Sequence, residues 1–158
     1  MTGQMVDETY ATEQLAETRI TIANRLQEIA TVTDALETFA HANGVSDEIV
    51  WRFHLALEEL IRNVITHAYP DKEVHQIQVR FECGETWMAA TVSDDGVPFN
   101  PLNAQAPDLS RALEDREIGG LGIHLARNVI DRVGYAWEAG RNVVTLQSPL
   151  TGYRRSPR

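Results

Sequence analysis

Three polar residues recur at every fourth position of the stretch LEELIRNVITHAY: Glu59, Asn63 and His67. An α-helix brings positions with this spacing to one face. A carboxylate one turn before a carboxamide offers oxygen ligands that suit a hydrated Mg²⁺ ion. The same spacing also fits a solvated helix face, which Glu58 and Arg62 would share. This motif alone leaves both interpretations open.

A second motif, VSDDGVPFNP, places Asp94 and Gly96 directly after an apolar run. Asp-Asp-Gly followed by Pro98 is good turn chemistry and needs no further function. Alternatively, Asp94 accepts a hydrogen bond from an exocyclic amine while Gly96 lets the backbone approach a flat ring. An adenine edge meets both requirements, so the motif fits either a plain turn or an adenine-binding turn.

The third motif is GGLGIHLA, Gly119 to Ala126, where glycines precede an apolar stripe at helical spacing. Such glycines permit a tight turn, and they also let backbone N–H groups approach phosphate oxygens at the positive end of a helix. Lys72 is the only lysine of the chain and does not belong to a Walker motif. A P-loop nucleotide site is therefore excluded.

Apolar spacing predicts the elements that position these motifs, in the order strand, helix, helix, strand, strand, loop, helix, strand, strand. Consecutive strands joined by short turns imply antiparallel pairing, so we expect an α+β fold of two layers. The landmarks are a strand at 19–22, a helix capped by Thr33 or Asp34 and ended by Gly44, a helix from Ser46 to Pro70, a hairpin turning at Gly84, a helix within 119–134 whose stripe includes Val133, and strands within 135–140 and 142–147.

The chain has 158 residues, which suits a single domain with one core. We expect a folded domain at residues 17–150 between flexible tails at 1–16 and 151–158. A formal net charge of -9 argues against nucleic-acid binding. Cys83 is the only cysteine, which excludes an intramolecular disulfide. Without a secretory leader or an apolar run of about 18 residues, the sequence predicts a cytoplasmic protein and no membrane segment.

Taken together, the motifs resemble those of a known family. Glu59-x-x-x-Asn63, Asp94-x-Gly96-x-x-Phe99 and Gly120-Leu121-Gly122 are similar to the N, G1 and G2 boxes of the GHKL, or Bergerat-fold, ATPases. The small size and the FNP after Asp-x-Gly look most like the anti-sigma-factor serine/threonine kinases of bacterial partner-switching systems.

The resemblance runs from about residue 17 to residue 148. It implies a two-layer α/β sandwich, with a mixed, mostly antiparallel sheet and helices on one face. ATP would lie between the layers, under a lid at roughly residues 100–118.

By the same resemblance, Asn63 matches a magnesium ligand and Glu59 a general base toward an attacking hydroxyl. Asp94 matches the aspartate that binds adenine, with Gly96 beside the ring. The implied cofactors are therefore ATP and Mg²⁺.

Gly120 and Gly122 match the glycines at the phosphates. Arg116 is a candidate cation there, and a solvated charge cluster is the alternative. His67 occupies a position where the family often has a histidine near the nucleotide, and packing at the helix end is the alternative.

One departure concerns the strand behind the adenine aspartate, where family members often have a threonine. Here the stretch reads Asn142-Val143-Val144-Thr145, and Asn142 and Thr145 are the candidates to replace that polar support.

The resemblance implies an ATP-dependent protein serine/threonine kinase that also acts as an anti-sigma factor. Its partners would be a sigma factor and a STAS-domain antagonist, phosphorylated on serine, and the chain would form a homodimer. Two alternatives are a non-catalytic ATP-binding switch that sequesters a partner, and a detached histidine-kinase-like ATPase domain.

Overall fold

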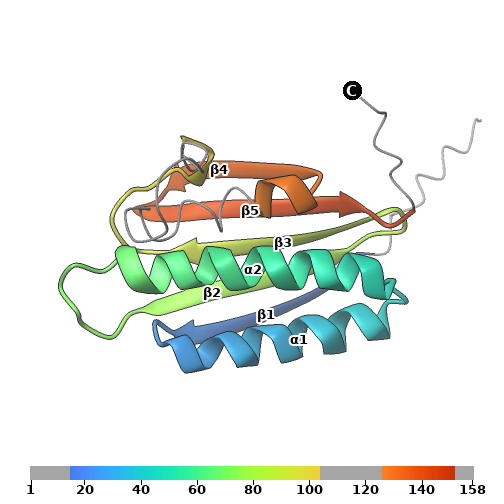
Figure 1. Ribbon diagram of the computed structural model, residues 1–158, viewed down its shortest axis with the longest axis horizontal. Helices are drawn as coiled ribbons and strands as arrows, with labels where there is room; N and C mark the ends of the chain where they lie inside the picture. Colours follow the sequence, from blue (N-terminus) through green and yellow to red (C-terminus); the bar gives the residue numbers. More distant parts are fainter. Residues whose placement is uncertain (1–14, 104–125, 152–158) are drawn as a thin grey trace, which may run out of the picture.

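The computed structural model describes residues 15–103 and 126–151, which form a five-stranded sheet with helices α1 and α2 packed on one face (Figure 1). This arrangement confirms the predicted α+β sandwich. Strand β1 begins one residue before the expected domain start, and the two expected tails lie largely outside the described residues. The elements are β1 Ala16–Ala23, η1 Leu26–Glu28, α1 Ile29–Ala42, α2 Asp47–His67, β2 Gln76–Cys83, β3 Trp87–Asp94, η2 Pro101–Asn103, β4 Arg132–Glu138 and β5 Arg141–Pro149.

The sheet has the strand order β1-β2-β3-β5-β4, and all four pairings between these described strands are antiparallel. Strands β2 and β3 form the predicted hairpin. Strand β5 lies between β3 and β4, and its register with β3 places Asn142 opposite Asp94. The topology thus brings the end of the Asp-x-Gly strand beside the start of the last strand.

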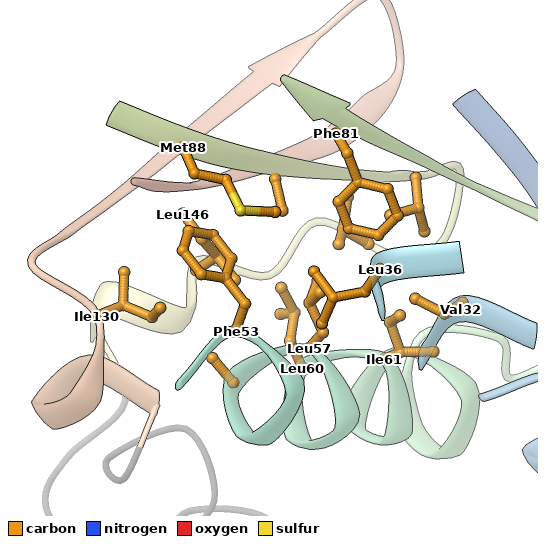
Figure 2. Close-up of a cluster of buried hydrophobic side chains, with 14 of the residues drawn as sticks. Val32, Leu36, Phe53, Leu57, Leu60, Ile61, Phe81, Met88, Ile130 and Leu146 are labelled. Atoms are coloured by element: carbon orange, nitrogen blue, oxygen red, sulfur yellow. The ribbon is translucent and has the colours of Figure 1, made fainter. Parts of the chain in front are cut away.

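The hydrophobic core lies between the sheet and the two helices (Figure 2). Helix α2 contributes side chains at helical spacing, and β2 contributes every second residue, because only one face of each element meets the other layer. The largest fully buried side chains include Phe53, Leu57 and Ile61 of α2, and Ile77, Val79 and Phe81 of β2.

Helix α1 begins at Ile29, so the predicted cap at Thr33 or Asp34 is wrong. Ile29 and Val32 extend the buried stripe toward the N-terminus, and that packing outweighs the capping tendency of the two polar residues. Ser46 is the N-cap residue of α2, as predicted, although its side chain makes no capping hydrogen bond.

The helix predicted within residues 119–134 is described only at 126–129. Ala126 and Ile130 are buried, as the stripe predicted. Val133, however, belongs to β4 and pairs with Leu146 of β5, so its assignment to the helix is wrong. Val133 does pack against the core, but it does so as a strand residue opposite Leu146 and not as part of a helix face. No helix within the described ranges is long and apolar enough to span a membrane.

Two aromatic residues of α2 provide a test of this packing. Phe53 is 0% exposed and Trp51 is 60% exposed. We expect Phe53→Ala to lower the free energy of unfolding by about 3–5 kcal/mol, because it leaves a cavity in the core. The matched change Trp51→Ala should alter it by less than about 0.5 kcal/mol. Urea denaturation followed by circular dichroism measures both values, and similar losses would contradict this core.

Candidate functional site

The polar face of α2 divides into two parts. Glu58 forms ion pairs with Arg62 at 2.9 Å and with His54 at 3.7 Å, so these three side chains make the solvated face. Glu59 and Asn63 are half-buried, as Glu58 is, but they take no part in these ion pairs. Ion pairing therefore separates Glu59 from the charged face of the helix.

Asn63 has a buried side-chain nitrogen, Nδ2, with no hydrogen-bond partner among the described residues. A buried amide without a partner costs about 1–3 kcal/mol, so a native structure normally supplies one. A bound water, phosphate or metal-bound water would satisfy this N–H, and the amide oxygen is a suitable magnesium ligand. His67, in contrast, is exposed in the last turn of α2.

Asp94 ends β3 and is 2% exposed. Its Oδ1 accepts hydrogen bonds from the backbone N–H of Gly96 and from Nδ2 of Asn142, each at 3.0 Å. Burial raises the pKa of the Asp94 carboxyl, while these two donors and the nearby Arg141 act in the opposite direction. Asp94 is thus a buried carboxylate held by specific donors, unlike the side chain of a plain surface turn.

Gly96 packs directly against the C-terminal end of α2. A Cβ atom there would lie 2.5 Å from the Cβ and 2.7 Å from the carbonyl oxygen of Ala68. The N–H of Val97 donates to that same oxygen at 2.9 Å. The first two motifs therefore meet in space: the Asp-x-Gly turn is docked on the helix that carries Glu59 and Asn63.

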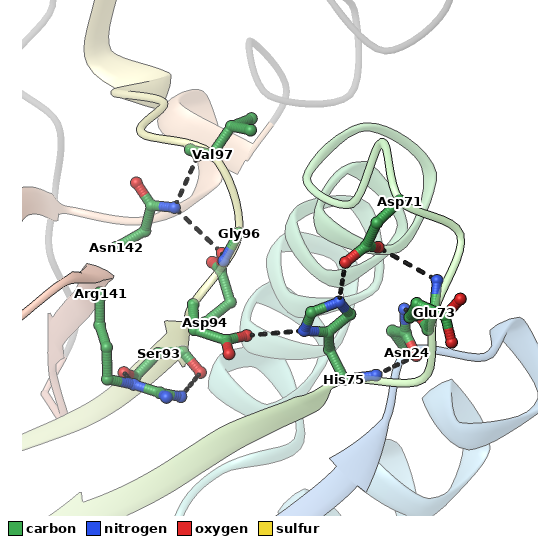
Figure 3. Close-up of polar contacts among 11 residues, drawn as sticks. Asn24, Asp71, Glu73, His75, Ser93, Asp94, Gly96, Val97, Arg141 and Asn142 are labelled. Carbon is green, nitrogen blue, oxygen red and sulfur yellow. Dashed lines mark hydrogen bonds and ion pairs between the residues drawn. The ribbon is translucent and has the colours of Figure 1, made fainter.

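Asn142 of β5 supports this turn from the other side (Figure 3). It is 3% exposed, and its Nδ2 donates to Asp94 Oδ1 and to the carbonyl oxygen of Val97, both at 3.0 Å. Its Oδ1 accepts from the N–H of Phe99 at 2.9 Å and from the hydroxyl of Tyr135 at 2.7 Å. Of the two candidates for the missing threonine, Asn142 makes the contact with Asp94.

A histidine between two carboxylates lies beside the turn, and sequence reasoning did not find it. Nε2 of His75 is 2.7 Å from Asp71 Oδ2, and Nδ1 is 3.4 Å from Asp95 Oδ1 (Figure 3). The ring stacks on Tyr69 at 4.3 Å between centroids, and the backbone N–H of His75 donates to Asn24. These contacts join the loop after α2 to the Asp-x-Gly turn, through residues whose sequence spacing follows no pattern.

The carboxylates of Asp71 and Asp95 shift the pKa of His75. The hydrogen bond with Asp71, followed by Asp95, raises the pKa of His75 above its ordinary value of 6.5. The pKa of Asp71 is lowered, chiefly by the backbone N–H of Glu73 and then by His75. Burial, with the two aspartates Asp94 and Asp95 nearby, raises the pKa of the Tyr69 hydroxyl.

The remaining predicted site residues, Gly120, Gly122 and Arg116, lie outside the described residues, as does most of the predicted lid. The start of that segment is anchored: Asn100 Oδ1 accepts from the N–H of Leu102, and Arg127 donates to the Leu102 carbonyl oxygen at 3.2 Å.

The described part of the site fits ATP and Mg²⁺ in two respects. Asp94 is a buried carboxylate that could accept from an exocyclic amine, and the unsatisfied amide of Asn63 lies one helical turn from the carboxylate of Glu59. Across the described ranges, no cluster of three His, Cys, Asp or Glu side chains is arranged to hold a metal.

Comparison with known proteins decides the family. Residues 22–148 match the family described as "Histidine kinase-like ATPase domain". The chain belongs to this family. Membership implies ATP binding, commonly with Mg²⁺. The match covers the described sheet except most of β1 and the last residue of β5.

This histidine kinase-like ATPase is similar in sequence to curated proteins that are named as protein kinases. It is 26% identical over 132 residues to the serine/threonine-protein kinase BtrW of Bordetella bronchiseptica, covering 73% of this chain and 93% of the relative. It is 30% identical over 115 residues to the serine-protein kinase RsbW of Listeria innocua, covering 70% of this chain and 73% of the relative. The family resemblance to anti-sigma-factor kinases is confirmed.

A solved structure agrees with the fold. The RsbU and RsbW domains of Rv1364c from Mycobacterium tuberculosis superpose on this histidine kinase-like ATPase with a TM-score of 0.63 and 18% identity. The match covers 90% of this chain and 35% of that longer chain.

The contact at Gly96 gives a stability prediction. Gly96→Ala should lower the free energy of unfolding by about 1–3 kcal/mol, because its Cβ would overlap the end of α2. Gly134→Ala is the matched control, since a Cβ there meets nothing within 4 Å. Both changes are measured by urea denaturation, and a Gly96→Ala protein as stable as the control would contradict the close contact.

The raised pKa of His75 gives a pH prediction. A folded-state pKa above the unfolded value of 6.5 contributes stability below that pH, which is lost as pH rises through the folded pKa. We therefore expect His75→Gln to destabilise the protein more at about pH 5.5 than at about pH 8.5. Urea denaturation at both pH values measures this difference. In an Asp71→Asn background the difference should shrink, and a difference that persists unchanged would contradict the pairing.

Proposed function

We propose that this protein is an ATP-dependent protein serine/threonine kinase and anti-sigma factor of a partner-switching system, which phosphorylates a STAS-domain antagonist on serine. The observation that carries the proposal is the junction at Ala68. It docks the Asp94–Gly96 turn on the helix that bears Glu59 and the unsatisfied amide of Asn63. The residues that recognise the base and those that act at the phosphates would then be held in fixed positions relative to one another.

In this proposal each described residue has a separate task. The Asp94 carboxylate would accept a hydrogen bond from the exocyclic amine of adenine, with Gly96 beside the flat ring. Asn63 would hold Mg²⁺ through its amide oxygen. Glu59 takes the proton of the attacking serine hydroxyl as a general base. Bound Mg²⁺ would neutralise charge that develops on the phosphate oxygens.

Other predicted groups complete the proposal from outside the described residues. Backbone N–H groups at Gly120 and Gly122 would contact the phosphates, and Arg116 would supply a positive charge. His67 would approach the nucleotide from the end of α2, where its exposed position leaves it free of the core.

The proposed partners are a sigma factor and a STAS-domain antagonist, with the protein acting as a homodimer in the cytoplasm. Relatives named as RsbW and BtrW kinases support this assignment. The net charge of -9 would steer basic partner surfaces toward the protein. We propose residues 17–150 as the domain that carries these activities.

The kinase assignment is tested by incubating the protein with Mg-ATP and a STAS-domain antagonist, followed by phosphosite mapping. We expect phosphoserine on the antagonist. Glu59→Gln should lower the rate by about 10²–10⁴-fold while ATP binding persists, because only the general base is lost. Glu58→Gln is the matched control, since Glu58 pairs with Arg62 on the other part of the helix surface.

Asp94→Asn should abolish ATP binding, whereas Asp95→Asn should not.

Two further observations separate the alternative functions. Partner binding that depends on ATP, with no phosphate transfer by the wild-type protein, would identify a non-catalytic switch instead. Acid-labile phosphate on the acceptor would identify phosphohistidine and contradict the serine-kinase assignment.

A further inference from the structure

We propose that Asn142 is a positioning residue that makes the nucleotide site selective for a 6-amino purine, because it fixes the orientation of Asp94. This inference rests on the proposed ATP site. It assigns a specific task to a residue on β5, outside the three motifs that suggested nucleotide binding.

All four hydrogen-bonding positions of the Asn142 amide are used. An Asn side chain has two N–H donors and an oxygen with two lone pairs. Both donors are taken, by Asp94 Oδ1 and the carbonyl oxygen of Val97. Both lone pairs are taken, by the N–H of Phe99 and the hydroxyl of Tyr135.

The partners also decide which way the amide faces. The backbone N–H of Phe99 can only donate, and the carbonyl oxygen of Val97 can only accept. The oxygen of Asn142 must therefore face Phe99, and its NH₂ group must face Val97 and Asp94. A flipped amide would lose both backbone hydrogen bonds, so Asn142 presents a donor to Asp94 and not an acceptor.

This donor determines what Asp94 can offer to a base. The two hydrogen bonds that Asp94 accepts from the described residues both end on Oδ1, which leaves Oδ2 for a ligand. A donor at Oδ1 also favours the ionised carboxylate against the effect of burial. An ionised carboxylate accepts only, so it pairs with an exocyclic amine and disfavours a carbonyl oxygen at the same place.

Loss of Asn142 would change both the orientation of the Asp94 carboxylate and its tendency to stay ionised. Asp94 would keep a single donor, the N–H of Gly96, and could rotate or take up a proton. A protonated carboxyl also donates, so it would accept a 6-oxo base as readily as a 6-amino base. The selectivity for the amine should then disappear even where the rest of the site is intact.

Thr145, the other candidate for this support, lies on the opposite face of the sheet. Successive residues of a strand point to opposite faces, and Asn142 and Thr145 are three positions apart. In the register, Thr145 pairs with Thr91, whereas Asn142 pairs with Asp94. Only Asn142 shares the face on which Asp94 is buried.

The test compares binding of ATP with binding of inosine triphosphate, in which an oxygen replaces the exocyclic amine. Calorimetric titration with Mg²⁺ gives both dissociation constants for the full chain. We expect the wild-type protein to prefer ATP by about 10–100-fold, the value of a hydrogen bond to a charged group. In Asn142→Leu the preference should fall to about threefold or less, chiefly through weaker ATP binding.

The ratio distinguishes positioning from a purely structural role, because a general loss of stability weakens both ligands alike. Ser148→Ala is the matched control: Ser148 is buried on the same face of β5, at its far end, and bonds the N–H of Asp131. Its ratio should equal that of the wild type.

If Asn142→Leu does not fold, Asn142→Ala provides the second variant. Alanine removes the amide with a smaller side chain, so Asp94 again loses this donor and the preference should again decrease. A wild-type ratio in any folded Asn142 variant would overturn the inference while leaving the ATP site in place. A wild-type protein without preference for ATP would overturn the proposed adenine site itself, and this inference with it.

Discussion

The contact between Gly96 and Ala68 is the constraint on which the rest of the site depends. It leaves no space for a side chain at Gly96, and the adjacent hydrogen bond from the Val97 N–H to the Ala68 carbonyl oxygen fixes the same junction. Since α2 is a continuous helix, a junction at its end also sets the place of Asn63 and Glu59. One close approach between helix and sheet thus positions both halves of the site.

Burial of polar groups at this junction explains why their partners are so specific. Asp94 and Asn142 are almost fully buried, where an unpaired polar atom is costly, and each is held by named donors and acceptors. Within the described part of the site, the amide nitrogen of Asn63 and the hydroxyl of Tyr69 are buried without a hydrogen-bond partner. Of these two groups, the Asn63 amide lies one helical turn from Glu59, and a ligand is expected there.

Much of the fold was predictable because local periodicity reports which face of an element is buried. The hairpin at Gly84 and the stripe on α2 were confirmed for this reason. The predicted start of α1 was wrong because core packing extends the helix to Ile29. The predicted assignment of Val133 to a helix was wrong because this residue, despite its helical spacing, pairs with Leu146 in the sheet. In the site, the motifs predicted Asp94 and Asn63, but the contacts of His75 with Asp71 and Asp95 join two separate loops, and no sequence motif indicates them.

The sequence by itself determined the element order, the family resemblance and the residue types needed for nucleotide chemistry, since these depend on local spacing. Only the tertiary structure decided which of the polar residues meet. It separated Glu58 from Glu59 by ion pairing, and it chose Asn142 over Thr145 by strand register. Such choices depend on long-range pairing and on the burial of individual atoms, which a linear pattern does not contain.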